Sequence, residues 1–567
     1  MVSVEYQQAI DQITSQGQPY ETVNVVVDGV EFLGFKNAPK NLRALYENAL
    51  SFESDFYVYE NERYTFQQAW STAAKVANRL QRLGIQPGDR VGISCRNYPE
   101  WIFAFMGITA AGCVAVAMNA WWSEEEMVYG IEHSGLKLLF ADSERVERIH
   151  QQVESLGIQL VTIRSEQAPH ESWEDFVAEQ SDLMPEVDID PDANATLMYT
   201  SGSTAHPKGV LSKHRSICNA LMGWEAGGMI GMQAMRNAGS ELPAPTEPPK
   251  FKPSMILSVP LFHVTGLTVQ FLSTFRFGRK LVGMYKWDVE EALKIIERER
   301  ITSFNGVPTM SYELVKSEKL NDYDLSSLQS AGGGGAAMAP EHAREINKKI
   351  SQGASGTGWG MTETQGLGTS IGGEAYMRRP KSCGRAIPPL VRVKAIDDAG
   401  TELAANETGE LCIWGIQNFS GYWRNERATE ETLVDGWVHT GDIGHVDSEG
   451  YVFITDRKKD IVIRGGENIG CQEVEAALYE HPDINEACVF GIPDERLGEI
   501  LGCVVSVNPD SMPTIDAIKA FARQHLSYHK VPEQIWVQTE RLPRTASEKI
   551  FKRQIRTDIL QELGFEV

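Results

Sequence analysis

Apolar and polar positions follow two alternating patterns along the chain. Short runs rich in β-branched residues predict buried strands, at 90–95, 113–118, 136–142, 195–199 and 255–260. Longer amphipathic segments, such as 123–135 and 288–300, predict helices between the strands. This alternation favours an α/β fold in which helices cover parallel or mixed sheets.

The pattern changes near Ile387. From there, short apolar runs joined by Gly- and Asp-rich turns predict a β-rich subdomain with few helices. After 456–460, short strands and helices alternate again. We therefore expect a large N-terminal domain over residues 1–458 and a small α+β domain over residues 459–567.

One segment satisfies the length criterion for a membrane span. Residues 101–122 carry no charged side chain over 22 positions. The segment nevertheless divides into a helix-like half and a β-rich half, and a helix-start signal follows at Ser123. We expect a buried helix and a buried strand, and no integral membrane segment.

Composition narrows the classes of function. The net charge of −24 over 567 residues argues against a nucleic-acid partner, because such proteins usually carry a basic face. The eight cysteines include no C-x-x-C pair, which disfavours a zinc or redox site and fits reduced thiols in a cytoplasm. The polar, acidic N-terminus resembles neither a signal nor a transit peptide.

Residues 199–210, YTSGSTAHPKGV, combine hydroxyls, glycines and Lys208 between a predicted strand and a helix predicted from Lys213. Pro207 stands where a Walker A loop needs a glycine, so the segment is not such a loop. It still suits a triphosphate, because hydroxyls, close backbone and one cation can all contact phosphate. A plain surface turn is the alternative that the segment alone leaves open.

Six further motifs follow residues 199–210 along the chain, and together they favour the phosphate-binding interpretation over a plain surface turn. They are PLFHVTG (260–266), GWGMTET (358–364), GELCIWG (409–415), GWVHTGD (436–442), DRKKDIVIRGGENIG (456–470) and LPRTASEKIFKRQIR (542–556). With the loop at 199–210, this series resembles the adenylate-forming superfamily, in its acyl-CoA synthetase branch. The resemblance implies ATP, Mg²⁺ and coenzyme A as cofactors and a carboxylic acid as substrate.

The same resemblance implies which residues form the active site. It assigns nucleotide and cofactor contacts to Thr200, Ser201, Gly202, Ser203, Thr204, Lys208, Gly334, Gly358, Trp359, Gly360, Met361, Thr362, Asp442, Arg457 and Lys549. It assigns Mg²⁺ to Glu363 and Thr204, a gate at the acyl site to His263, and catalytic roles to Lys549, Thr204, Glu363 and His263. The residue types suit these roles, since a Trp face can stack on adenine, a carboxylate suits Mg²⁺ and an Asp can accept ribose hydroxyls.

Lys549 is the predicted centre of the chemistry. A cation between an attacking carboxylate and an anionic phosphorus offsets their repulsion. The resemblance implies that the acid forms acyl-AMP first and that the small, mobile domain then rotates about Lys459, which brings Gly465 and Gly466 to the thiol tunnel.

An apolar helix after His263 and the four-glycine segment at 330–338 favour a hydrophobic acid, of medium or long chain. The sequence leaves several alternatives open. The acid could be an aryl or terpenoid acid, and the adenylate could be transferred to a carrier protein, oxidised with light or closed to a lactone. A nucleotide-binding regulator and a homodimer also stay open. Three positions depart from the family pattern: Ala205 and Glu548 replace glycines, and Cys471 replaces a proline.

Overall fold

A computed structural model describes residues 3–165, 170–200, 207–240, 249–335, 338, 340–350, 354–465, 467–509, 511–546 and 548–565. Every strand and helix predicted from the patterns above is present, with ends that differ by a few residues. The predicted mixed α/β fold, with a large N-terminal and a small C-terminal domain, is confirmed.

The first main sheet is largely parallel, as continuous apolar strands require. Its order is β21 (Gly421–Tyr422), β11 (Lys208–Lys213), β10 (Asn194–Thr200), β6 (Val114–Ala117), β5 (Arg90–Ser94), β7 (Leu138–Asp142), β8 (Gln159–Ile163) and β9 (Glu171–Ser172). Strands β10, β6, β5, β7, β8 and β9 pair in parallel. The nearby helices are α3 (Phe66–Arg82), α4 (Pro99–Ala110), α5 (Glu124–Ser134), α6 (Ser143–Ile149), α7 (Val153–Leu156) and α8 (Trp173–Val177).

The second sheet is longer and mixed. Its order is β19 (Arg392–Ile396), β20 (Gly409–Trp414), β23 (Trp437–Val446), β24 (Tyr451–Arg457), β18 (Gly384–Ala386), β17 (Thr369–Gly372), β16 (Ala354–Trp359), β15 (Ser330–Gly334), β14 (Ser303–Gly306), β12 (Ser254–Leu257), β13 (Lys280–Gly283), β3 (Asp55–Tyr59) and β4 (Glu62–Thr65), with β22 (Leu433–Val434) on β23. The β-rich segment after Ile387 is therefore continuous with this sheet, through the pairing of β24 with β18.

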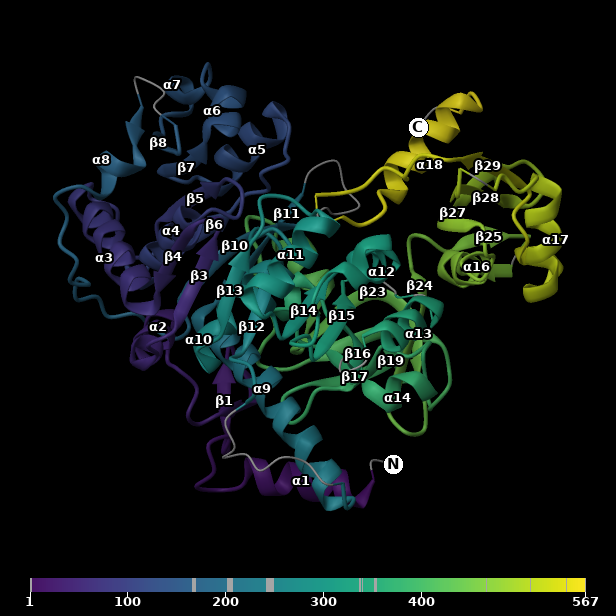
Figure 1. Cartoon of the computed structure of the whole chain (residues 1–567), viewed down its shortest axis with the longest axis horizontal. Helices are drawn as coiled ribbons and strands as arrows, with labels where there is room; N and C mark the ends of the chain where they lie inside the picture. Colours follow the sequence, from purple (N-terminus) through teal and green to yellow (C-terminus); the bar gives the residue numbers. More distant parts are fainter. Residues whose placement is uncertain are drawn as a thin grey trace.

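Further helices accompany this second sheet. They are α2 (Leu42–Asn48), α9 (His214–Asn237), α10 (Thr274–Phe277), α11 (Val289–Glu299), α12 (Pro308–Lys316), α13 (Pro340–Lys349), α14 (Gly373–Arg378) and α15 (Glu426–Thr432). A separate hairpin of β1 (Thr22–Val27) and β2 (Val30–Phe35) follows α1 (Val4–Thr14), which packs along α9 (Figure 1).

Residues 101–117 of the apolar segment form most of α4, a turn and then β6, all deeply buried, whereas Trp121 after β6 is 43 % exposed. The expected helix and strand are confirmed. Within the described chain, no helix is both long enough and apolar enough to cross a bilayer.

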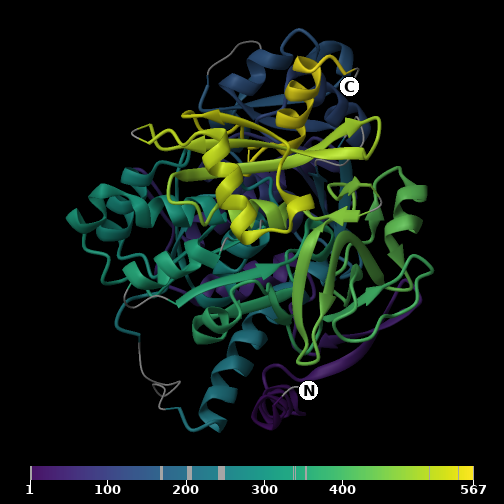
Figure 2. The same ribbon diagram turned by 90° about the vertical axis from the view of Figure 1, so that its right-hand side faces the viewer.

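The C-terminal part has its own sheet, which begins after β24 ends at Arg457. Its order is β26 (Glu467–Ile469), β25 (Val462–Arg464), β28 (Gly498–Val507) and β27 (Ile484–Asp494), with β29 (Gln534–Gln538) on β28. Helices α16 (Cys471–Leu478), α17 (Ile515–His525) and α18 (Lys552–Glu562) accompany it. Figure 1 shows this part at one end of the molecule, and Figure 2 shows it from the front.

Candidate active site

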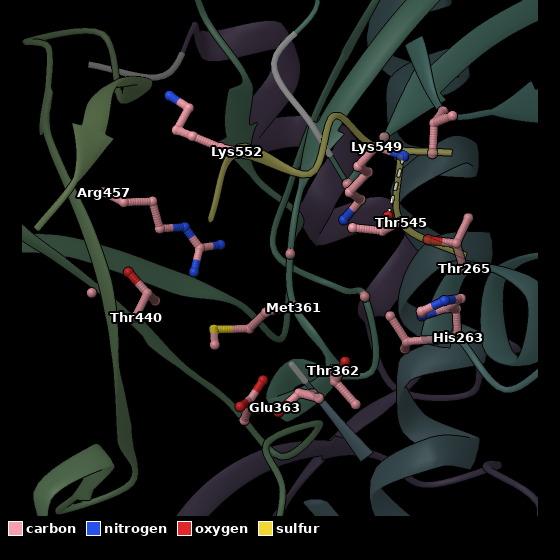
Figure 3. A pocket seen from close by; sticks show the side chains of 18 of the residues that line it. His263, Thr265, Met361, Thr362, Glu363, Thr440, Arg457, Thr545, Lys549 and Lys552 are labelled. Carbon is pink, nitrogen blue, oxygen red and sulfur yellow. Dashed lines mark hydrogen bonds between the residues drawn. The ribbon is translucent and has the colours of Figure 1, made fainter. Parts of the chain in front are cut away.

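A cavity of about 1600 Å³ lies between the two parts of the chain. Its floor is formed where parallel strands of the second sheet end, at Gly306, Gly334 and Gly358. Ligands of open α/β sheets bind at this edge, outside the carboxyl ends of the strands. The opposite wall comes from the C-terminal part and includes Lys549 and Lys552 (Figure 3).

Glycines at the floor have distinct steric roles. A Cβ at Gly360 would lie 2.2 Å from the carbonyl oxygen of Gly366, and one at Gly358 would lie 2.6 Å from that of Thr369. A Cβ at Gly334 would meet only the Gly358 oxygen, at 3.8 Å. Gly358 and Gly360 therefore allow close backbone packing beneath the cavity, whereas Gly334 leaves space within it.

Lys549 enters the cavity from a turn before α18. The turn is closed by hydrogen bonds from Thr545 N to Lys549 O (2.8 Å) and from Lys549 N to the Thr545 hydroxyl (3.3 Å). A Cβ at Gly335, whose φ is +79°, would lie 3.2 Å from Lys549 Nζ, so the ammonium sits directly over the end of β15. Burial, followed by repulsion from Arg457, lowers the pKa of Lys549 to about 8.

Glu548 stands directly before Lys549 with a φ of +61°. This is the left-handed region, which favours glycine. The backbone here thus has a conformation that favours glycine, the residue that the family pattern implies at this position, although the side chain is a glutamate.

The predicted phosphate segment is the hairpin of β10 and β11, with Thr200 paired to Lys208. The prediction of a loop up to Lys213 is wrong, because 208–213 continue the first sheet as a strand with Val210 and Ser212 buried. Ser201, Gly202, Ser203, Thr204 and Ala205 lie outside the described residues. Thr200 and Lys208 both line the cavity.

Lys208 and Glu363 both contact Tyr422. The Lys208 ammonium lies 4.8 Å from the Tyr422 ring centroid, and the Tyr422 hydroxyl donates a 2.7 Å hydrogen bond to Glu363 Oε1. Burial raises the pKa of Glu363, while the Tyr422 hydrogen bond lowers it. Sequence reasoning missed Tyr422, since nothing in its local pattern connects it with a residue 59 positions earlier.

Glu363 follows Met361 and Thr362, and all three line the cavity (Figure 3). Mg²⁺ is usually held by one or two carboxylates together with phosphate oxygens, and Glu363 supplies one such carboxylate in the cavity. Among the described residues, Glu363 therefore fits the metal that the sequence implies, whereas Thr204 lies outside them.

Trp359, Asp442 and Arg457 form a chain of contacts beside a smaller cavity of about 180 Å³. Trp359 Nε1 donates to Asp442 Oδ2 (2.7 Å), and Arg457 Nε lies 2.6 Å from Asp442 Oδ1. Burial raises the pKa of Asp442, and Arg457 lowers it. Trp359 is 8 % exposed and packs in a hydrophobic cluster, so its indole is both part of the core and part of this cavity's wall.

His263 lies before a π-helix over Thr265–Leu272, a geometry often found at functional sites. Its Nε2 is buried and has no hydrogen-bond partner among the described residues. Burial and the nearby Lys549 lower the pKa of His263 to about 3, so the ring is neutral. His263, Thr265 and Val269 line the cavity together with Trp224 from α9.

Gly465 does not line the cavity that contains Lys549 and His263. It lies at a turn with a φ of +59°, where its N donates to Leu497 O (2.7 Å), and it is outside the lining of the cavity. Gly466 lies outside the described residues.

Comparisons with known proteins identify the family of this chain. The family model described as AMP-binding enzyme matches residues 46–423, and the model of the AMP-binding enzyme C-terminal domain matches residues 473–549. A long-chain-fatty-acid–CoA ligase of Bacillus subtilis is 31% identical over 88% of this chain and 90% of its own length. A 4-coumarate–CoA ligase of Oryza sativa is 30% identical over 87% of both chains.

A solved fatty acyl CoA synthetase of Mycobacterium tuberculosis superposes with a TM-score of 0.70 at 26% identity, over 92% of this chain and 99% of that one. The family matches cover both the large and the small part of the chain. This protein therefore belongs to the family of AMP-binding enzymes.

Proposed function

We propose that this protein is an AMP-forming ligase that joins a hydrophobic carboxylic acid to coenzyme A. The observation that carries the proposal is the position of Lys549, whose Nζ lies over the end of β15 in the cavity that Glu363, Lys208 and Arg457 also line. An isolated basic helix face would point into solvent. The lysine instead lines the same cavity as Glu363, Lys208 and Arg457, which supports a role between a carboxylate and a phosphate.

In the proposed first half-reaction, a carboxylate oxygen attacks the α-phosphorus of ATP and pyrophosphate leaves. Protonated Lys549 stands between the two anionic groups and offsets the charge that develops. Lys208 and the hydroxyls of 200–204 hold the phosphates, and Asp442 with Arg457 holds the ribose. Glu363 and Thr204 would hold Mg²⁺, which would supply positive charge to neutralise the phosphates.

In the proposed second half-reaction, the thiol of coenzyme A attacks the acyl carbonyl and AMP leaves. We propose that residues 1–458 and 459–567 act as separate units that rotate about Lys459 between the two steps. Gly465 lies away from the cavity when Lys549 is inside it. This fits a role for Gly465 and Gly466 in the second step alone.

The acid is proposed to be a medium- or long-chain fatty acid. The lining of the cavity includes the apolar side chains of Trp224, Val269 and Ile371 and the uncharged His263. The relatives include enzymes for fatty acids and for an aryl acid at nearly equal identity, so aryl acids belong in the test.

A panel of fatty and aryl acids, assayed by ATP-dependent pyrophosphate release, tests the activity and the substrate class. Lys549→Ala should lower adenylation by about 10²–10³-fold, as expected for loss of a charge-stabilising group. The same variant, given acyl-AMP and coenzyme A, should form the thioester within about threefold of the wild-type rate. An equal loss in both half-reactions would refute the role of Lys549.

A further inference from the structure

Asp456 is a buried carboxylate that the proposed chemistry does not use. It is 1 % exposed and lies near the end of β24, directly before Arg457. Its Oδ1 accepts the N–H of Arg457 (2.7 Å). Its Oδ2 accepts the N–H of Cys471 and lies 3.4 Å from the N of Gln472. A single carboxylate therefore binds backbone donors on both sides of Lys459.

The donors at 471 and 472 are the first two N–H groups of α16. A helix leaves its first N–H groups without partners inside the helix, and a side chain at the N-cap usually satisfies one of them. The N-cap of α16 is Gly470, which has no side chain to do so. Asp456 replaces the missing cap from another sheet, and its negative charge also suits the positive end of the helix dipole.

Helix α16 in turn supports the turn that carries Lys549. Glu475, one turn along α16, lies 2.8 Å from the ammonium of Lys552, three residues after Lys549. Glu475 also accepts the N–H of Val489 on β27 (2.8 Å). The contacts thus run from Asp456 through α16 to the beginning of α18, and so to the lysine in the cavity.

Cys471 makes this capping contact possible. It occupies the first position of α16, where the family pattern described above implies a proline. Proline suits this position conformationally, because its fixed φ matches the helix, but it has no N–H to donate. The cysteine therefore gives this chain a hydrogen bond to Asp456 that a proline could not form.

We infer that Asp456 and the backbone N–H of Cys471 are positioning groups that hold the C-terminal part in the arrangement required for adenylation. The inference rests on the proposed function, in which rotation at Lys459 separates the two half-reactions. Since the two groups lie on opposite sides of Lys459, such a rotation breaks their contact. The contact then favours the first half-reaction and opposes the change to the second.

A matched pair of substitutions tests this inference. Cys471→Pro removes the N–H and the thiol, whereas Cys471→Ala removes the thiol and keeps the N–H. The ratio of adenylation to thioester formation from supplied acyl-AMP should fall about fivefold in Cys471→Pro, the usual effect of losing a helix cap. Cys471→Ala should leave this ratio within about twofold of wild type. Equal ratios in the two variants, or a parallel loss of both half-reactions in Cys471→Pro, would overturn the inference.

Hydrogen exchange gives a readout that does not depend on activity. The amides of a peptide that spans 471–472 should exchange at least fivefold faster in Asp456→Ala than in wild type, while peptides of α17 stay unchanged. Unchanged exchange at 471–472 would refute the contact. Absence of pyrophosphate release from the wild type would instead refute the proposed function, and the exchange result would still decide whether Asp456 caps α16.

Discussion

The backbone conformation of Glu548 sets the direction of the chain at Lys549, the next residue. Its φ of +61° costs a residue with a side chain about 1–2 kcal/mol relative to ordinary helical values. Arg544 holds the turn by donating from Nη1 to the carbonyl oxygen of Glu548 (2.6 Å). The turn thus uses a non-glycine residue where the backbone favours glycine, and a neighbouring side chain stabilises it.

The adenylation rates of variants at Glu548 should depend on how well each new residue tolerates a positive φ. Glu548→Gly and Glu548→Asn should keep the adenylation rate within about threefold, because both residues adopt the left-handed region. Glu548→Val should lose about tenfold or more, since a β-branched residue is strained there. Single-turnover pyrophosphate release would measure the rates. A valine variant as fast as the asparagine variant would show that the turn does not control Lys549.

Among elements, the β10–β11 hairpin could be predicted only in part. The run 195–199 has the apolar composition of a buried strand, whereas 208–213 begins and ends in lysine and has no clear alternation. Strand β11 forms because it pairs with β10 and with β21, and the latter lies more than 200 residues later. Partners so distant in sequence leave no local signal, and Tyr422 on β21 was missed for the same reason.

The contact of β21 with Glu363 predicts a pH effect. Tyr422→Phe removes the hydrogen bond that lowers the pKa of Glu363, so burial raises that pKa further. A higher pKa means that Glu363 stays protonated to a higher pH, and a protonated carboxyl binds Mg²⁺ poorly. If Glu363 holds Mg²⁺ as proposed, the acid limb of kcat/KM for Mg·ATP should therefore move to higher pH, and the loss of activity should grow as the pH falls.

Tyr422→Leu is the comparison for this change, because it also removes the ring that contacts Lys208. It should raise the KM for ATP across the whole pH range. If Tyr422→Phe left the acid limb unchanged, Glu363 would not be the group that limits activity at low pH.

For the whole molecule, the motif order indicated that residues distant in sequence would meet at one site. Lys549, Glu363, Lys208 and Arg457 indeed line one cavity. The contacts that hold the two parts together had no sequence signal. Asp456 lies in the DRKKD motif, but the motif does not show that its carboxylate binds N–H groups of α16, and Glu313 resembles any helix glutamate until its partners are known. Such contacts depend on how the two parts pack, which local composition does not determine.

The packing of the two parts includes an ionic contact between α12 and the chain before the turn of Lys549. Glu313 on α12 binds Arg541, which precedes the turn of Lys549, and lies 3.9 Å from Arg544. Arg541 is half exposed, so the pair alone contributes only about 0.2–1 kcal/mol. Reversal of one charge adds repulsion. Arg541→Glu would face Glu313, and Glu313→Lys would face both arginines.

Each single reversal should therefore slow adenylation by about three- to tenfold, because it disfavours the arrangement that places Lys549 in the cavity. Thioester formation from supplied acyl-AMP should not slow. The double variant Glu313→Lys/Arg541→Glu restores an attractive pair between positions 313 and 541, although a lysine at 313 still faces Arg544 and no longer accepts from Trp287 Nε1 (2.8 Å). Its adenylation should therefore be faster than that of the slower single variant at low salt. A double variant as slow as the slower single variant would show that the two charges do not act on each other. In that case the contact would have no part in holding Lys549 over β15.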